Sequence, residues 1–265
     1  MTISDWFLNN TADICVSCII ILCFVFTVLY RIHVKRESEI FATDDNLSAS
    51  PLFDDAANAG DDVGDAFLRE VGHARVHSSL GSNTSLLDVA ADTGPAGKKF
   101  LKEFTEVPDW VDMDLVQRGQ AFQRQWVEVI FSTGLASLIE SYGYSNGAQI
   151  LVETGRLACC GEAHKRALET ATFNLDLFEH GVGPGQAGQD RVARVRVLHC
   201  MVRQHVQSAC PWWDAHTMGV PVSQEDGAHT VFHNSHTALC GMQNLGLPVC
   251  ARDMDAVSMF WAYVG

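Results

Sequence analysis

The chain is short of basic residues. It carries 18 lysine and arginine residues against 32 aspartate and glutamate residues, which gives a formal net charge of −14. Proteins that bind nucleic acid or an anionic membrane surface through their main interface need an excess of positive charge. The balance argues against either as the main partner, and we expect no nucleic acid among the partners.

Strand-like alternation of apolar and polar residues is also missing. Apolar residues instead recur at helical spacing, as in the segment that follows Pro108. Residues 127–144 are nearly all apolar and are expected to form a central buried helix. The patterning predicts an all-α fold.

A cleavable signal peptide carries positive charges before its apolar run. The longest apolar run of this chain has no such charges before it. Residues 12–30 contain one charged residue, Asp13, and a basic cluster follows from Arg31. About twenty apolar residues suffice to cross a bilayer. We therefore expect an uncleaved transmembrane helix over residues 12–30 and a luminal or exterior tail over residues 1–11. The rest of the chain would then lie in the cytosol.

Large apolar residues are scarce over residues 31–99, which are acidic and rich in Asp, Ala, Ser and Gly. Such a segment cannot bury enough apolar surface to offset the chain entropy that folding removes. We expect an acidic, largely disordered linker there, with helical character over residues 66–80. The folded domain is expected over residues 100–265.

The nine cysteines form no metal-binding pattern, and no C-x-x-C-H motif for covalent haem attachment occurs. Three of them fall in the apolar run, and the spacing of the other six is irregular. In a cytosolic domain we expect free thiols.

Two helical segments, residues 162–178 and 189–206, organise the remaining chain. The glycine-rich residues 179–188 between them cannot continue a helix. The second segment has an apolar stripe at helical spacing, and His199 falls inside it. The stripe consists of Val192, Val195, Val202 and Val206.

On the first segment, Arg166, Glu169 and Thr170 lie three and four residues apart and so share one face. This face and the stripe around His199 can form two walls of a cofactor slot. The alternative interpretation is that His199 is a hydrogen-bonded core histidine and that the three polar residues are ordinary solvated positions.

Several motifs follow one another in a fixed order. The first segment contains R-x-x-E-T and the second R-V-x-x-L-H-x-x-V-R. The motifs P-x-W-V-D, R-G-Q-x-F, S-L-x-x-x-Y-G and E-T-G-R-L precede them, and G-x-P-x-x-Q-x-D follows, with Thr230 and Phe232 after it as T-x-F. This order resembles the family of latex clearing proteins (rubber oxygenases) and MpaB-like oxygenases, over about residues 107–265. Relatives in that family continue for several more helices, so the domain over residues 100–265 is expected to be incomplete at its C terminus.

The resemblance implies a helical domain that holds haem b, with His199 as the proximal iron ligand. Arg166 and Thr170 match polar residues of the family's distal side. Glu169 stands where rubber-cleaving members have a lysine, which argues against polyisoprene as the substrate. It is either a base for an allylic proton or, buried beside Arg166, part of a structural ion pair. Arg203, one turn after His199, would contact a haem propionate or would belong to a solvated helix face.

The activity that the resemblance implies is that of a membrane-anchored oxygenase of the type bound to the endoplasmic reticulum. Such an enzyme activates O₂ for oxidative cleavage of a carbon–carbon double bond in a lipophilic, isoprenoid-like substrate. The predicted anchor over residues 12–30 suits this substrate, because lipophilic chains partition into membranes.

Two other functions fit parts of the sequence. His229 and His233 lie four residues apart, and His236 follows, so a non-haem metal could bind there in a membrane oxidoreductase. A catalytically inactive, anchored interaction protein is the other alternative. It would be recognised by haem content without reaction with oxygen.

Overall fold

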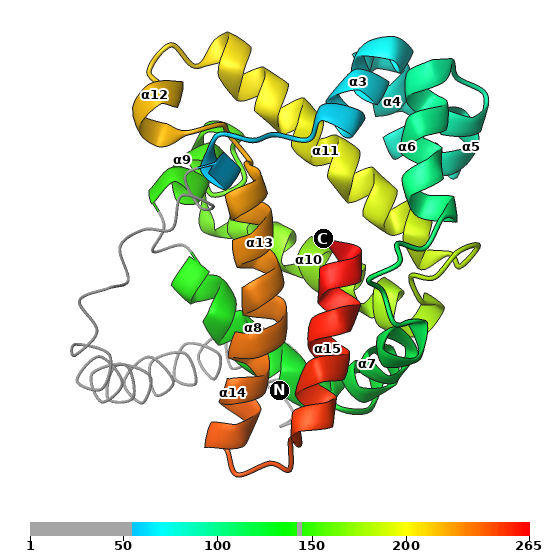
Figure 1. The fold of residues 1–265 in the computed structure, drawn as a ribbon. Coiled ribbons are helices and arrows are strands. Elements are labelled where there is room, and N and C mark those ends of the chain that lie inside the picture. Colours follow the sequence, from blue (N-terminus) through cyan, green and yellow to red (C-terminus); the bar gives the residue numbers. More distant parts are fainter. Residues whose placement is uncertain (1–54, 142–144) are drawn as a thin grey trace, which may run out of the picture. The chain divides into compact units, whose positions relative to one another are not determined.

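The computed structural model of the protein describes residues 55–141 and 145–265. In this part of the chain the regular elements are helices and none is a strand, which confirms the all-α prediction for these residues (Figure 1). None of the helices described is both long enough and apolar enough to cross a membrane. The predicted tail (residues 1–11) and anchor (residues 12–30) lie outside the described residues.

The first helices pack together against α11 (Gly188–Ala209), and we call them the N-terminal cluster. They are α3 (Asp62–Val71), α4 (His73–Leu80), α5 (Leu86–Ala91) and α6 (Pro95–Thr105). The rings of Phe67 and Phe100 stack in the core of this cluster with their centroids 4.6 Å apart. From α11, Ala193 and Val197 complete the same core.

The prediction of a largely disordered linker over residues 31–99 is therefore wrong over residues 62–99. Large apolar residues are few there, but those present recur at helical spacing and are buried, as Phe67 and Val76 are. A short amphipathic helix needs only one apolar face, so an average composition hides it. Asp61 also caps α3 by accepting the backbone N–H of Gly64 at 2.9 Å.

Arginines of α11 attach the N-terminal cluster. Arg196 donates two hydrogen bonds, of 2.6 and 2.8 Å, to the carboxylate of Asp61. Arg203 forms an ion pair of 3.0 Å with Asp65. Arg194 donates to the backbone carbonyl groups at the end of α4. The two arginines of the R-V-x-x-L-H-x-x-V-R motif are Arg194 and Arg203, and both thus hold the N-terminal cluster on α11.

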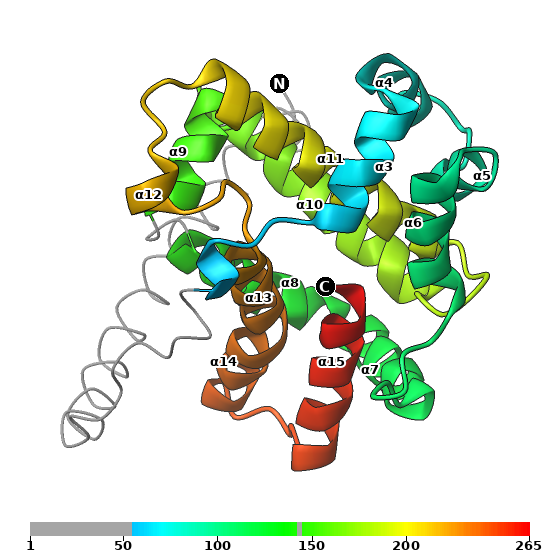
Figure 2. The same cartoon turned by 45° about the horizontal axis from the view of Figure 1, so that its top comes forward.

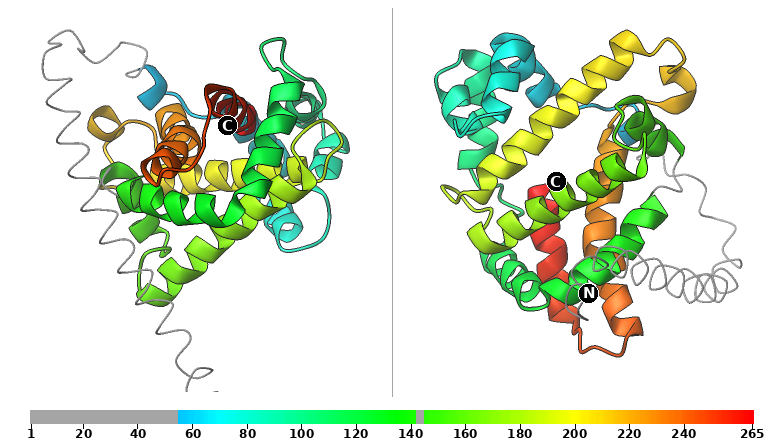
Figure 3. Two further views of the ribbon diagram at one scale, coloured as in Figure 1. Left: turned by 90° about the horizontal axis from the view of Figure 1, so that it is seen from below. Right: turned by 180° about the vertical axis from the view of Figure 1, so that it is seen from behind.

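A second core lies among the later helices. They are α7 (Met113–Gln125), α8 (Val127–Ser141), α10 (Cys160–His180), α14 (Ala238–Asn244) and α15 (Ala251–Val264). α7 and α15 lie side by side (Figures 2 and 3). A Cβ atom on Gly119 would lie 2.3 Å from the carbonyl oxygen of Ala256, so glycine permits this close approach. Trp261 donates its indole N–H to the buried Gln123 at 2.7 Å, which fixes α15 on α7.

Four shorter elements complete the described part of the chain. α9 (Ser145–Glu153) precedes α10, and α12 (Ala215–Met218) connects α11 to α13 (Gln224–Phe232). α13 continues through one π-helical turn, η1 (His233–Thr237), into α14 (Figure 1).

The predicted pair of helical segments is confirmed as α10 and α11, each slightly longer than expected. α10 ends at Gly181, whose φ of 70° favours glycine. A Cβ atom on Gly188, the first residue of α11, would lie 2.0 Å from the carbonyl oxygen of Gly181. The two glycines allow the chain to reverse within a few residues.

Candidate functional site

The apolar stripe of α11 runs between the cores of the protein. Val206 is buried, and Val192, Val195 and Val202 are half-buried. Val192 contacts both the core of the N-terminal cluster and the second core. Val202 packs on a small third core that contains Val206 and Ile150. The stripe is therefore an apolar wall inside the protein, as its spacing predicts.

His199 lies in this wall, and its side chain is accessible to solvent. Its pKa is nevertheless lowered to about 4, first by desolvation and then by the charges of Arg203 and Arg166, against smaller opposing effects of Asp226 and Asp61. Accessibility and desolvation are compatible where water reaches the imidazole but protein surrounds it on most sides. His199 is thus a neutral imidazole at pH 7. The alternative of a buried core histidine is wrong.

Arg166 and Thr170 lie one turn apart on α10, and both are half-buried. Their face of the helix continues to Phe173 and Leu177, which belong to the second core. The positive charge of Arg166 acts on His199, so these two predicted site residues are near each other across the α10–α11 pair. Arg166 and Thr170 are therefore not ordinary solvated positions, and Arg166 lies in the same region of the protein as His199.

Glu169 is placed differently. Its side chain is exposed, and its carboxylate forms an ion pair with Arg156, in the segment between α9 and α10. The expectation that Glu169 is buried beside Arg166 is therefore wrong. Its role as a base stays a prediction.

Arg203 is almost fully buried. One terminal nitrogen pairs with Asp65, and the other donates to the carbonyl oxygen of Val222 at 2.7 Å. Its Nε–H has no acceptor among the described residues. The alternative of a solvated helix face is wrong, and the guanidinium is largely committed to holding the N-terminal cluster. A propionate contact stays a prediction.

The histidines proposed for a non-haem metal do not form one ligand set. The rings of His229 and His233 lie 5.0 Å apart between centroids. His236 instead stacks on Phe232 and approaches Cys240, whose sulfur lies 3.4 Å from its Nε2. The three histidines are not among the groups of three or more ligand atoms, all within 4.8 Å, that occur in the described residues.

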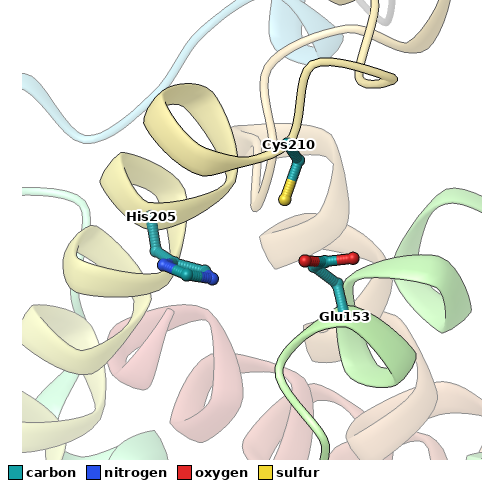
Figure 4. Close-up of side chains that lie close together, drawn as sticks. All are labelled: Glu153, His205 and Cys210. Atoms are coloured by element: carbon teal, nitrogen blue, oxygen red, sulfur yellow. The ribbon is translucent and has the colours of Figure 1, made fainter.

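One such group does occur elsewhere in the described residues. It consists of Glu153 at the end of α9, His205 on α11 and Cys210 directly after α11, and the three side chains converge in Figure 4. Desolvation and a hydrogen bond to Glu153 raise the pKa of the Cys210 thiol. Sequence analysis missed this group, because Glu153 is 52 residues from His205. Only the H-x₄-C spacing at the end of a predicted helix was available as a signal.

In comparisons with known proteins, no family model, no curated protein and no solved structure gives a significant match to this chain. The resemblance to the oxygenase family therefore stays a prediction.

The surroundings of His199 supply two of the features that a b-type haem needs, whereas the valines of the α11 stripe pack mainly on the protein's own cores. Such a haem needs a neutral imidazole for its iron, an apolar slot, and cations for its propionates. His199 is neutral and accessible, and the valine stripe of α11 is apolar. Arg166 supplies a nearby positive charge, whereas most donors of Arg203 are already engaged.

Proposed function

We propose that the protein is a membrane-anchored haem b oxygenase that uses O₂ to cleave a carbon–carbon double bond in a lipophilic, isoprenoid-like substrate. The observation that carries the proposal is the state of His199, a solvent-accessible imidazole whose pKa is about 4. A histidine that stays unprotonated well below pH 7 is poorly suited to a surface ion pair. It is well suited to ligating a metal ion.

His199 would hold the iron, and Arg166 would pair with a propionate or with an anionic group of the substrate. When bound, the haem supplies the redox chemistry that activates O₂. Thr170, half-buried one turn from Arg166, has a hydroxyl group that can orient a polar atom on that side. The valine stripe would exclude water from a lipophilic chain beside these groups.

Glu169 has a restricted place in this proposal. An exposed carboxylate that pairs with Arg156 can accept a proton only if the substrate reaches the outer edge of α10. The substrate class rests on the sequence resemblance and on the expected anchor over residues 12–30. The endoplasmic reticulum as location has the same basis, with the catalytic domain in the cytosol.

The first prediction concerns haem content. We expect the full chain, purified in detergent after haem-replete expression, to show a Soret band and close to one haem per chain in a pyridine haemochrome assay. His199→Ala should lose most of this haem, because it removes the iron ligand. His216→Ala is the control, since it changes an exposed histidine outside both candidate sites and should retain haem.

A folded protein without haem, or equal haem in His199→Ala and the control, would contradict the proposal. Activity is tested by O₂ consumption and by carbonyl products from an unsaturated isoprenoid. A stoichiometric haem protein that does not react with O₂ would point to the inactive interaction protein instead.

A further inference from the structure

We propose that Glu153, His205 and Cys210 form a binding site for one divalent metal ion of the zinc class. The site is separate from the one around His199 and does not depend on the proposed function. His199 and His205 are six residues apart on α11, and at about 100° per residue they lie roughly 120° apart around the helix.

The fold brings the three ligands together through the third core. Ile150 of α9 packs on Val206 and Cys210, at the end of α11. Glu153 lies three residues after Ile150, so it shares that face of α9 and stands beside the same contact. His205 precedes Val206. The apolar contact therefore determines where the carboxylate, the imidazole and the thiol meet.

Hydrogen bonds hold this frame in place. The backbone N–H of Cys210 donates to the carbonyl oxygen of Val206 at 3.1 Å, which closes the last turn of α11. The chain leaves the helix axis after Cys210. Trp213 donates its indole N–H to the carbonyl oxygen of Gly219 at 3.0 Å, which fixes the segment after Cys210. The amide of Asn146 donates to Met218, which ties α9 to that segment. The sulfur is thus presented from a well-defined turn.

The ligand atoms suit zinc in kind and in distance. Carboxylate, imidazole and thiolate are the groups that zinc prefers, and they lie within 4.8 Å of one another. Bonds of about 2.0–2.3 Å would bring tetrahedral ligand atoms to roughly 3.3–3.7 Å apart. Glu153 and His205 are exposed, so their side chains have room to turn through the difference, while the buried Cys210 is the fixed ligand.

Binding replaces one proton by the metal ion. The S–H bond of Cys210 breaks, a sulfur–metal bond forms, and the proton leaves to solvent, with no change of oxidation state. Three protein ligands leave a fourth position, which water can fill, as in open zinc sites. Glu153 also lines a shallow depression of about 280 Å³ together with Ala148, Gln149, Val152 and Trp212. The open position of the metal would therefore be accessible from outside.

Cobalt(II) is the probe for this site. We expect the full chain in detergent, after removal of metals by a chelator, to bind one Co²⁺ with a near-ultraviolet sulfur-to-cobalt charge-transfer band. Difference spectra against the metal-free protein remove any haem absorption. Zn²⁺ should displace the cobalt and abolish the band.

His205→Asn and Cys210→Ser should each weaken Co²⁺ binding at least about tenfold, since loss of an outer-shell partner alone costs about 10- to 100-fold. The matched controls are His216→Asn and Cys159→Ser, which change an exposed histidine and an exposed cysteine outside the group. Unchanged binding in His205→Asn would overturn the proposal, as would the absence of a charge-transfer band in the parent. If Cys210→Ser does not fold, the exposed His205 decides the question alone.

Discussion

The charge of Arg166 keeps His199 unprotonated, together with desolvation and the charge of Arg203. This has a direct consequence for haem-free protein. In Arg166→Met the pKa of His199 should rise from about 4 toward its ordinary value of 6.5, because one repulsive positive charge is removed. The measurement is an NMR titration of the histidine ring protons, with the His199 signals assigned from their absence in His199→Ala.

Lys165→Met is the control for this titration, since Lys165 is an exposed neighbour on α10 and is not among the charges that act on His199. Equal pKa values of His199 in the parent and in Arg166→Met would show that the two side chains do not share an environment. The two-walled arrangement of α10 and α11 would then have to be abandoned.

The ion pair between Glu169 and Arg156, unlike the desolvated His199, is exposed to solvent. Both side chains are more than a third exposed, so solvent screens their attraction. Exposed pairs contribute between about 0 and 1 kcal/mol to stability. Its most direct effect is therefore local, on how the segment before α10 meets that helix.

Among the elements, α3 depends on buried charges for its attachment to α11. Burial raises the pKa of Asp61, but the hydrogen bonds and charge of Arg196 outweigh this, and the net shift is downward from 3.8. A carboxylate with a lowered pKa in the folded state stabilises the protein above its unfolded pKa. That contribution is lost as the pH falls through the folded value.

Asp61→Asn should therefore lower the free energy of unfolding by about 1.5–3 kcal/mol at pH 7, as expected for hydrogen bonds to a charged group. The difference from the parent should shrink as the pH falls below about 4, because the unfolded parent takes up a proton there while the folded parent keeps Asp61 ionised, and it should be lost only below the lowered folded pKa. Urea denaturation at pH 7 and pH 3 measures both. Asp62→Asn changes the adjacent exposed carboxylate and should cost far less; a difference that did not depend on pH would contradict the linkage.

The features that could be predicted from the sequence are those that depend on residues close together in the chain. α10, α11 and the turn between them depend on spacing and on glycines within 50 residues, and these were predicted. The helical character predicted over residues 66–80 is confirmed by α3 and α4, but the packing of the N-terminal cluster was missed. Its stability comes from α11, more than 100 residues away, through pairs such as Asp61–Arg196. The burial of Arg203 and the convergence of Glu153 with His205 and Cys210 likewise depend on packing that no local pattern records.

At the scale of the whole described region, α11 contributes to both the N-terminal cluster and the second core. One side completes the core of the N-terminal cluster, and the other meets the second core through Val192. A chain that starts at residue 100 would lack α3–α5 and the first turn of α6. It would expose Ala193 and Val197 and leave Arg196 and Arg203 without their aspartates.

We therefore expect a chain over residues 55–265 to unfold in one cooperative thermal transition by circular dichroism. A chain over residues 100–265 should be insoluble or should lack that transition, because the apolar face of α11 that the N-terminal cluster covers would be exposed to solvent. A cooperative transition at the same temperature in both would show that the N-terminal cluster is an independent addition.

Because α11 is one unbroken helix, it fixes the spacing of the residues along its axis. His199 and His205 are six residues apart on one unbroken helix, so their rise along its axis is about 9 Å. The side chains point to different sides of the helix, so the two metal ions would be farther apart than this rise. Paramagnetic centres held within two turns of one helix still relax each other's electron spins. Cobalt at Cys210 and His205 would therefore broaden the electron paramagnetic resonance signal of a ferric iron held by His199. Zinc, which has no unpaired electron, would not.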